Sequence, residues 1–236
     1  MQLNCDIGEG FDEVDIAVMP LIDMANIACG GHVGDIHSMR KTLTLAKHHS
    51  IRVGAHPSYP DRQNFGRKSL DITTAELSVS LTQQLDNFCQ HCNDLSIEPS
   101  YIKPHGALYN DCLKHPNTLK CVLQLAQKFQ LPLMLQALPD TRAMRTAANT
   151  YNVELIFEAF ADRRYQDNGL LVSRSEALAL IENIDDIAEQ AIELKNNARV
   201  RSISQNWLTI DANSLCVHGD CALAIEAVKR IRRVFA

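Results

Sequence analysis

Short apolar runs alternate along this chain with longer segments in which apolar residues recur at helical spacing. The short runs are continuously apolar, which is typical of strands that are buried on both faces, as in a parallel sheet. This pattern predicts strands at residues 3–6, 25–28, 52–55, 101–102, 133–135, 154–157, 207–210 and 215–217. It predicts helices at residues 12–23, 36–50 and 73–94, in stretches through 129, up to about 148, at 175–195 and at about 222–234.

Strand–helix alternation with seven or eight repeats predicts an α/β protein with a parallel sheet and helices outside it. A closed barrel and an open doubly wound sheet both fit this alternation. Polar residues follow nearly every strand, as on the active-site face of a (β/α) barrel, whereas an open sheet concentrates them at one crevice. We therefore expect residues 1–236 to form a single (β/α)-barrel domain, a size at which one full core is usual.

The composition narrows the choice of partner and compartment. The formal net charge is −5, and no basic stripe crosses the interior of the chain, which argues against nucleic acid. The basic cluster at residues 229–233 falls in the last helix, where it opposes the negative helix end. No apolar stretch approaches the ~20 residues of a membrane span, and the N-terminus lacks the pattern of a signal peptide. Eight cysteines without a framework spacing then predict reduced thiols in a cytoplasmic protein.

The chemistry is most concentrated where a short apolar run leads into Lys103, Pro104, His105 and Gly106. Lysine offers a fixed positive charge, and histidine can gain or lose a proton near neutral pH. Proline cannot continue a central strand, and glycine permits a tight turn. This segment is predicted to carry a cation and a proton carrier from a strand end into a cleft.

The same arrangement recurs at the earlier strand ends. Asp6 and Glu9 follow the first strand and suit a general base or a metal ligand. His32 and His56 each follow a strand, as His105 does. Together with Asp6, these histidines could build a His/carboxylate metal site or a metal-free acid/base cluster. Spacing along the chain does not choose between the two, because the residues come from different strands.

Two later strand ends are also polar. A charge-dense loop contains Glu158, Asp162, Arg163 and Arg164. It suits either a salt-bridged turn or an anchor for an anionic substrate, because arginine binds carboxylate or phosphate through two parallel hydrogen bonds. His218 and Asp220 give a weaker signal, since Asp220 could simply cap the last helix.

Several familiar motifs are absent or uninformative. Cys89 and Cys92 match C-x-x-C but fall inside a predicted helix, so we interpret them as helix surface. The sequence contains no G-x-x-x-x-G-K-[ST] and no G-x-S-x-G. A nucleotide, if one is used, must be held by another device or by another subunit.

Six collinear motifs carry a family resemblance. They include LNCDIGEGF at residues 3–11, ANIACG at 25–30, GAHPSYPD at 54–61, KPHGALY at 103–109, EAFADRRY at 158–165 and VHGD at 217–220. On these residues the chain resembles the LamB/YcsF family over nearly its whole length. It departs from the family pattern at Gly31, Val33 and Ile36, where Phe, Ala and Pro are usual, and the loss of an aromatic ring beside His32 bears on pocket shape.

The resemblance implies a barrel of the glycoside hydrolase/deacetylase type, usually seven-stranded. It also implies an ATP-dependent 5-oxoprolinase that opens 5-oxoproline to glutamate with two partner subunits, B and C, and with ATP and Mg as cofactor. Such a site needs a cation for the substrate carboxylate, donors for the oxyanion and an acid/base pair. We expect the catalytic residues to be Asp6, Glu9, His32, His56, Lys103, His105 and Glu158. We expect the substrate-binding residues to be Asn26, Tyr59, Asp162, Arg163 and His218.

Two alternative functions stay open on these residues. One is a metal-dependent amide or carbohydrate deacetylase, which the barrel type and the His/Asp set support. The other is a non-catalytic subunit whose pocket only holds a ligand, which Gly31 and the missing nucleotide motif support.

Overall fold

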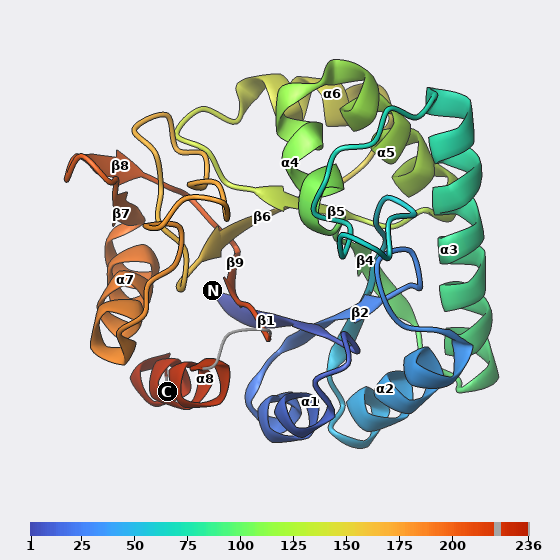
Figure 1. Ribbon diagram of the computed structural model, residues 1–236, viewed down its shortest axis with the longest axis horizontal. Helices are drawn as coiled ribbons and strands as arrows, with labels where there is room; N and C mark the ends of the chain where they lie inside the picture. Colours follow the sequence, from blue (N-terminus) through green and yellow to red (C-terminus); the bar gives the residue numbers. More distant parts are fainter. Residues whose placement is uncertain (220–222, 236) are drawn as a thin grey trace.

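The computed structural model describes residues 1–219 and 223–235. Seven parallel strands close a barrel in the order β1-β2-β3-β4-β5-β6-β9 (Figure 1). These strands are β1 (Gln2–Ile7), β2 (Met24–Ala28), β3 (Arg52–His56), β4 (Pro99–Ile102), β5 (Leu133–Gln136), β6 (Leu155–Phe160) and β9 (Ser214–Val217). The predicted (β/α) barrel is confirmed, and seven described strands form it, the lower of the two predicted numbers. Asp220, which the sequence offered as a cap of the last helix, lies outside the described residues.

Helices surround this barrel (Figure 1). They are α1 (Asp12–Val18), the short 3-10 helix η1 (Met19–Leu21), α2 (Ile36–His48), α3 (Thr74–Asp94), α4 (Gly106–Lys114), α5 (Pro116–Phe129), α6 (Arg142–Thr150), α7 (Ile184–Asn197) and α8 (Ala224–Phe235). Asp35 caps α2 in a reciprocal box with Ser38, as the sequence predicts. Thr73 and Glu76 form the same box at α3. No described helix is long and apolar enough to cross a membrane.

The region after β6 differs from the prediction. The helix expected from residue 175 begins only at Ile184, where the Asn183 side chain accepts the backbone N–H groups of Asp185 and Asp186. The strand expected at 207–210 forms as β8 (Trp207–Thr209), but it pairs antiparallel with β7 (Arg199–Arg201) outside the barrel. The barrel closes without it, because β6 pairs directly with β9.

The barrel interior has an apolar layer beneath a polar one. Met24, Tyr101 and Met134 form a small cluster of their own inside the barrel, separate from the larger core between strands and helices. Gly54 gives Tyr101 room, because a Cβ at this position would lie 2.2 Å from the tyrosine ring. Alternate side chains of β1 face opposite sides of the strand. Asn4 faces the barrel interior and belongs to the polar layer above this apolar cluster.

The C-x-x-C pair lies on α3, inside a helix as predicted, but the surface assignment is wrong for one of its members. Cys92 is buried in the core and Cys89 is half-buried. Helical spacing alone does not say which face of a helix packs against the core, so the sequence did not show that Cys92 is buried.

Candidate active site

The cation of the predicted site lies deep in the barrel mouth. Lys103 follows β4, and its Nζ lies 2.8 Å from Asp6 Oδ1 of β1 and 2.8 Å from Glu158 Oε1 of β6. The Asp6 contact is an aligned hydrogen bond, whereas the Glu158 contact meets the distance but not the angle of one. Nζ also lies 3.3 Å from Cys216 Sγ and 3.4 Å from Asn4 Oδ1. The lysine therefore ties three strands together at the floor of the site.

The charges in this group stabilise one another against burial. Burial alone would lower the pKa of Lys103, but the Asp6 carboxylate and its neighbours hold this pKa well above the ordinary value. Burial alone would raise the pKa of Asp6, but Lys103 and then His56 hold it well below the ordinary value. At neutral pH the pair is therefore an ammonium beside a carboxylate.

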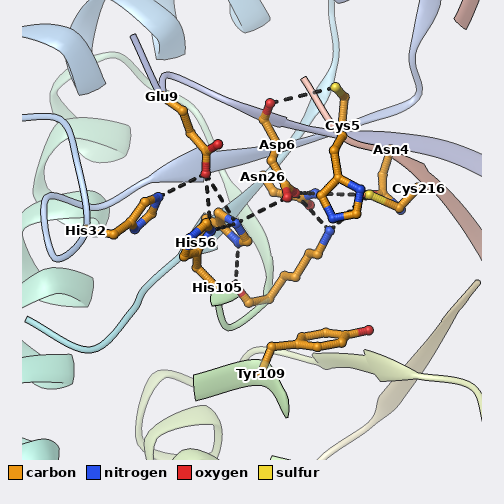
Figure 2. Close-up of polar contacts among 12 residues, drawn as sticks. Asn4, Cys5, Asp6, Glu9, Asn26, His32, His56, His105, Tyr109 and Cys216 are labelled. Carbon is orange, nitrogen blue, oxygen red and sulfur yellow. Dashed lines mark hydrogen bonds and ion pairs between the residues drawn. The ribbon is translucent and has the colours of Figure 1, made fainter. Parts of the chain in front are cut away.

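Glu9 gathers three histidines from different elements (Figure 2). Its Oε1 lies 2.9 Å from His32 Nε2, 3.2 Å from His105 Nδ1 and 3.8 Å from His56 Nε2. His32 and His105 stack with their ring centroids 3.6 Å apart. Burial raises the pKa of Glu9, yet its contacts with the His105 and His32 rings bring it far below the ordinary value. Burial lowers the pKa of His32 to about 3 and also lowers that of His105, although Glu9 opposes both shifts.

Backbone carbonyls fix the tautomers of two of these histidines. His56 Nδ1 lies 2.8 Å from the carbonyl oxygen of Lys103, and His105 Nε2 lies 3.0 Å from that of Phe65. A carbonyl only accepts, so these two ring nitrogens carry the protons. The remaining nitrogens, His56 Nε2 and His105 Nδ1, are 2.9 Å apart. In neutral rings both present lone pairs, so this arrangement calls for a proton or a metal cation at that point.

A second histidine site lies at the end of β9, close to Asp6. Asp162, which follows β6, is buried, and its carboxylate lies 2.9 Å from His218 Nδ1 while accepting the His218 backbone N–H at 3.1 Å. Burial raises the pKa of Asp162, but His218 brings it down to about 2. The carboxylate thus holds the proton on His218 Nδ1 and leaves Nε2 as the other ring nitrogen for chemistry. Phe160 stacks on this imidazole with a centroid distance of 5.5 Å.

A cavity of about 700 Å³ opens above these groups at the carboxyl ends of the strands. Seven of the predicted site residues line it: Asp6, Glu9, His56, Lys103, His105, Arg163 and His218. Four others lie behind this wall and hold the lining residues in place: Asn26, His32, Glu158 and Asp162. Glu158 belongs to β6 itself, not to the loop in which the sequence pattern placed it.

Two of the predicted substrate contacts have other partners. Tyr59 is not among the cavity-lining residues, and its buried hydroxyl donates to Asp111 Oδ2 at 2.9 Å. Arg163 lines the cavity, but it donates to the carbonyl oxygens of Val172 and Ala179. It therefore fastens the segment between β6 and α7 that forms one wall of the cavity.

Three residues of the site lack an assignment from the sequence: Asn4, Tyr109 and Cys216. Asn4 and Cys216 lie two residues before Asp6 and His218, so strand alternation puts them on the same inward face and could have revealed them. Tyr109 donates to Glu158 Oε2 at 2.9 Å from α4, a contact between distant elements that no local pattern predicts.

Gly31, the main departure from the family motifs, does not line the cavity. A Cβ here would lie 2.5 Å from Gln84 Oε1 and 2.5 Å from Ser58 Oγ. Gln84 fills this space and hydrogen-bonds the backbone of Ser58 through both of its amide atoms. The absence of a side chain at Gly31 therefore leaves the space that the Gln84 side chain of α3 occupies.

Among the residues that the structure describes, two groups have donor atoms close enough to hold a metal ion. Glu9, His32, His56 and His105 form one group, in which all donor atoms lie within 4.8 Å of one another. Asp6, Cys216 and His218 form the other, but the ammonium of Lys103 already contacts Asp6 and Cys216. Only the first group presents lone pairs to a shared point that no described cation fills.

A family model for the LamB/YcsF family matches residues 1–236. The chain belongs to the LamB/YcsF family. It is 44% identical to the 5-oxoprolinase A subunit of Pseudomonas fluorescens, over 98% of this chain and 95% of that protein. It is 42% identical to the protein of the same name from Vibrio cholerae serotype O1, over 98% of this chain and 96% of that one.

The solved structures support the same relationship. The lactam utilization protein of Thermus thermophilus is 26% identical and superimposes with a TM-score of 0.89, covering 100% of this chain and 95% of that one. A putative cellobiose-phosphate cleavage protein of Enterococcus faecalis is 13% identical with a TM-score of 0.58, over 98% of this chain and 89% of that one, which extends the likeness of fold alone. The resemblance inferred from the six motifs is confirmed.

Proposed function

We propose that this chain is the A component of an ATP-dependent 5-oxoprolinase, which opens the cyclic amide of 5-oxo-L-proline to L-glutamate. Support comes from full-length relatives named as the A subunit of 5-oxoprolinase and from the likeness to a lactam utilization protein. The observation that carries the proposal is the cavity floor, where a buried ammonium, carboxylates and histidines from different strands converge. We further propose that the chain acts with two partner subunits, B and C, and that the assembled enzyme uses ATP with Mg.

Ring opening adds water across the lactam amide. The bond between the carbonyl carbon and the ring nitrogen breaks, the water oxygen joins the carbon, and the nitrogen takes a proton. The reaction therefore needs a base beside the water, positive charge near the carbonyl oxygen and an acid beside the nitrogen.

We assign the activation of the attacking water to the Glu9 cluster, which consists of Glu9, His32, His56 and His105. These residues fit a divalent metal. Imidazole nitrogens with one carboxylate suit zinc-like ions. The carbonyl oxygens of Lys103 and Phe65 orient two of the rings from outside, as is usual for metal-bound histidines. A bound metal would lower the pKa of a water molecule and polarise the amide carbonyl. Glu9, His56 and His105 would hold it, with His32 as a further donor.

The charge balance of the floor supports the same assignment. Asp6, Glu9 and Glu158 are carboxylates with at most 6% of their surface exposed, and Lys103 is the ammonium among them. Burial also disfavours charge on His32 and His105. A dication at the cluster would offset the excess of buried negative charge.

We assign the acid to His218, with Asp162 as its positioning residue. His218 lines the cavity at the end of β9, and its Nδ1 proton is held by Asp162. Its Nε2 would then deliver a proton to the ring nitrogen as the C–N bond breaks. Lys103 lines the floor between the two histidine sites and would stabilise charge on the carbonyl oxygen, while Asp6 and Glu158 fix its ammonium.

Reconstitution tests the function. Purified subunits B and C, ATP and 5-oxoproline are assayed for glutamate with this chain, without it, and with His218→Gln, which keeps a polar side chain but cannot shuttle a proton. We expect turnover only with the wild-type chain, and a loss of roughly 10²–10⁴ in kcat for the variant. Equal turnover without this chain would reject its role, and wild-type turnover with the variant would identify His218 as a bystander.

Metal analysis tests the cofactor. Protein purified without chelators should contain about one zinc-like ion per chain, and Glu9→Gln with His105→Ala should lose it. Cobalt substitution gives a second reading, because visible absorption by bound cobalt reports the ligand set without any activity assay. Wild-type protein that stays metal-free when supplied with zinc, manganese or cobalt would favour a proton shared between His56 and His105 instead.

A metal-dependent amide or carbohydrate deacetylase is a second candidate, favoured by the same His/carboxylate cluster. Release of acetate from acetylated sugars or amides by this chain alone, without ATP or partner subunits, would support it over ring opening.

A further inference from the structure

A second cavity lies outside the barrel, where α7 and the hairpin of β7 and β8 come together (Figure 1). Its lining comes from α7, from the hairpin and from the segment between β6 and α7, and the two cavities have no described lining residue in common. Its volume of about 240 Å³ is below the ~300–1,000 Å³ of sites for drug-sized ligands. An occupant of this cavity, which we call the α7 cavity, is therefore a small molecule.

One cation in this lining has no partner. Arg164 lines the α7 cavity and is partly buried. Its side chain makes no hydrogen bond or ion pair with any described residue, and its Nε is buried without an acceptor. A buried donor without an acceptor is unfavourable. A carboxylate is the acceptor that suits it best, because a guanidinium group binds a carboxylate through two parallel hydrogen bonds.

The α7 part of the lining carries the opposite charge. One face of the helix contributes four residues: Asp186, Glu189, Gln190 and Glu193. Glu193 is paired, since its Oε2 lies 2.7 Å from Arg199 Nε. The carboxylates of Asp186 and Glu189 have no hydrogen-bond or ion-pair partner in the part of the chain that the structure describes. Unpaired charges of both signs therefore line one cavity without contacting each other.

The remaining surface of the α7 cavity is largely apolar. Ile181 and Val200 line it and are buried, whereas Ile203 and Trp207 line it and are 44% and 42% exposed. The Trp207 ring is held by Arg201, whose guanidinium carbon lies 4.2 Å from the ring centroid. A ligand with an apolar group can cover this exposed surface.

Hydrogen bonds hold the lining in place. The Gln190 side chain donates from Nε2 to the carbonyl oxygens of Phe160, Ala161 and Arg163 at 2.8, 3.2 and 2.8 Å. The backbone N–H of Ile203 donates to the carbonyl oxygen of Tyr165 at 2.8 Å. These contacts fasten α7 and the hairpin to the chain on either side of Arg164. The cavity is thus largely formed before a ligand binds, which lowers the entropic cost of binding.

We propose that the α7 cavity binds a free α-amino acid with an apolar side chain. Its carboxylate binds Arg164, and its ammonium group binds Asp186 and Glu189. Its side chain packs against Ile203 and Trp207. A ligand with a single charge leaves either the cation or the carboxylates of the cavity unpaired, whereas a zwitterion satisfies both. L-Glutamate fits less well, because its second carboxylate meets the acidic face of α7.

The chain contains its own reporter for this site. Trp207 is the single tryptophan of the sequence and lines the cavity, so its fluorescence follows binding without an activity assay. The full chain is titrated with L-leucine, L-phenylalanine and L-glutamate, and calorimetry gives an independent reading of the same titrations. Isocaproate and isoamylamine are analogues of leucine that lack the ammonium group and the carboxylate, respectively. They test whether both charges are recognised.

Two variants test the charges of the cavity. Arg164→Gln and Glu189→Gln each remove a charge that has no partner among the described residues, so neither breaks a polar contact. The matched controls are Arg233→Gln and Glu13→Gln, at exposed positions that do not line the cavity.

We expect L-leucine and L-phenylalanine to bind the wild-type chain and to change the fluorescence of Trp207. Each cavity variant should weaken this binding roughly tenfold or more, because it loses a charge-assisted contact, and each control should stay within about twofold. L-Glutamate and both leucine analogues should bind roughly tenfold or more weakly than L-leucine.

A wild-type chain that binds neither apolar amino acid in either measurement would overturn the inference. Cavity variants that bind as tightly as the controls, or an analogue or L-glutamate that binds as tightly as L-leucine, would overturn it as well. The inference does not rest on the proposed function, since the ring-opening steps use none of the residues that line the α7 cavity. Turnover in the reconstituted mixture and binding to the chain alone therefore stand or fall separately.

Discussion

Replacing Lys103 should destabilise the fold as well as stop the reaction. Lys103→Met keeps much of the aliphatic stem but removes the ammonium that lies 2.8 Å from both Asp6 and Glu158. These carboxylates are 6% and 0% exposed, so neither can be rehydrated without opening the barrel mouth. The variant therefore tests whether the floor is held together by this one charge.

The magnitude follows from burial and distance. At an effective dielectric constant of about 20, one contact of this length gives roughly 6 kcal/mol of attraction, most of which offsets the desolvation of the two charges. Removing one partner of a buried pair leaves the other charge unpaired and typically costs about 3–5 kcal/mol. Against a usual stability of about 5–15 kcal/mol, the loss is large but can be measured.

The pH dependence gives the prediction a second reading. Lys103 helps to hold the pKa of Asp6 well below its ordinary value, so the pair contributes stability above the unfolded pKa of aspartate and loses it as the pH falls through the folded value. In the variant, Lys103 no longer lowers the pKa of Asp6, so the buried carboxylate can lose its charge by binding a proton. The difference between wild type and variant should therefore be greatest near neutral pH and should narrow by about pH 4.

The assay is urea unfolding followed by circular dichroism at about pH 7 and about pH 4. Lys120→Met, at an exposed position of α5, is the control and should change the free energy of unfolding by less than about 0.5 kcal/mol. Glu158→Gln and the double variant complete a cycle, in which a coupling of about 0.5–3 kcal/mol is expected. A Lys103→Met protein that unfolds at the same urea concentration as wild type at neutral pH would refute the reasoning.

Three further predictions concern the support around the site. Asp15 accepts the Gly8 N–H at 2.9 Å, and burial raises the pKa of its carboxyl group to about 6. The free energy of unfolding therefore falls as the pH rises from about 4 to 6. In urea unfolding, Asp15→Asn should raise this free energy by about 1–3 kcal/mol at neutral pH and change it little at about pH 4. Tyr101→Phe leaves the buried oxygen of Asn26, now 2.6 Å from the tyrosine hydroxyl, without that donor and should cost about 1–3 kcal/mol in the same assay. Asn183→Ala removes the cap of α7 and should lower the thermal midpoint by the equivalent of about 1 kcal/mol, whereas no change would indicate that the helix start is fixed by its neighbours.

The sequence was most informative where a signal is local. Continuous apolar runs predicted the barrel strands, and Asp35 marked the start of α2 because a cap is a contact between near neighbours. The prediction was wrong for residues 175–183, where contacts with Asp162 and Arg163 override a helical pattern. The strand predicted at 207–210 does form as β8, but the sequence did not show that it pairs with β7 outside the barrel, since a strand's partner is decided by which edge is available.

The chemistry of the site divides in the same way. The sequence by itself determined the residue types and placed Asp6, His56, Lys103, His105 and His218 at strand ends, because a strand end is a local feature. Only the tertiary structure decided that Lys103 bridges two carboxylates, that Asp162 orients His218 and that Glu9 joins three histidines. Each of these is a contact between residues far apart in the chain. Its distance is set by barrel closure, and its charge state is set by burial, neither of which any stretch of sequence contains.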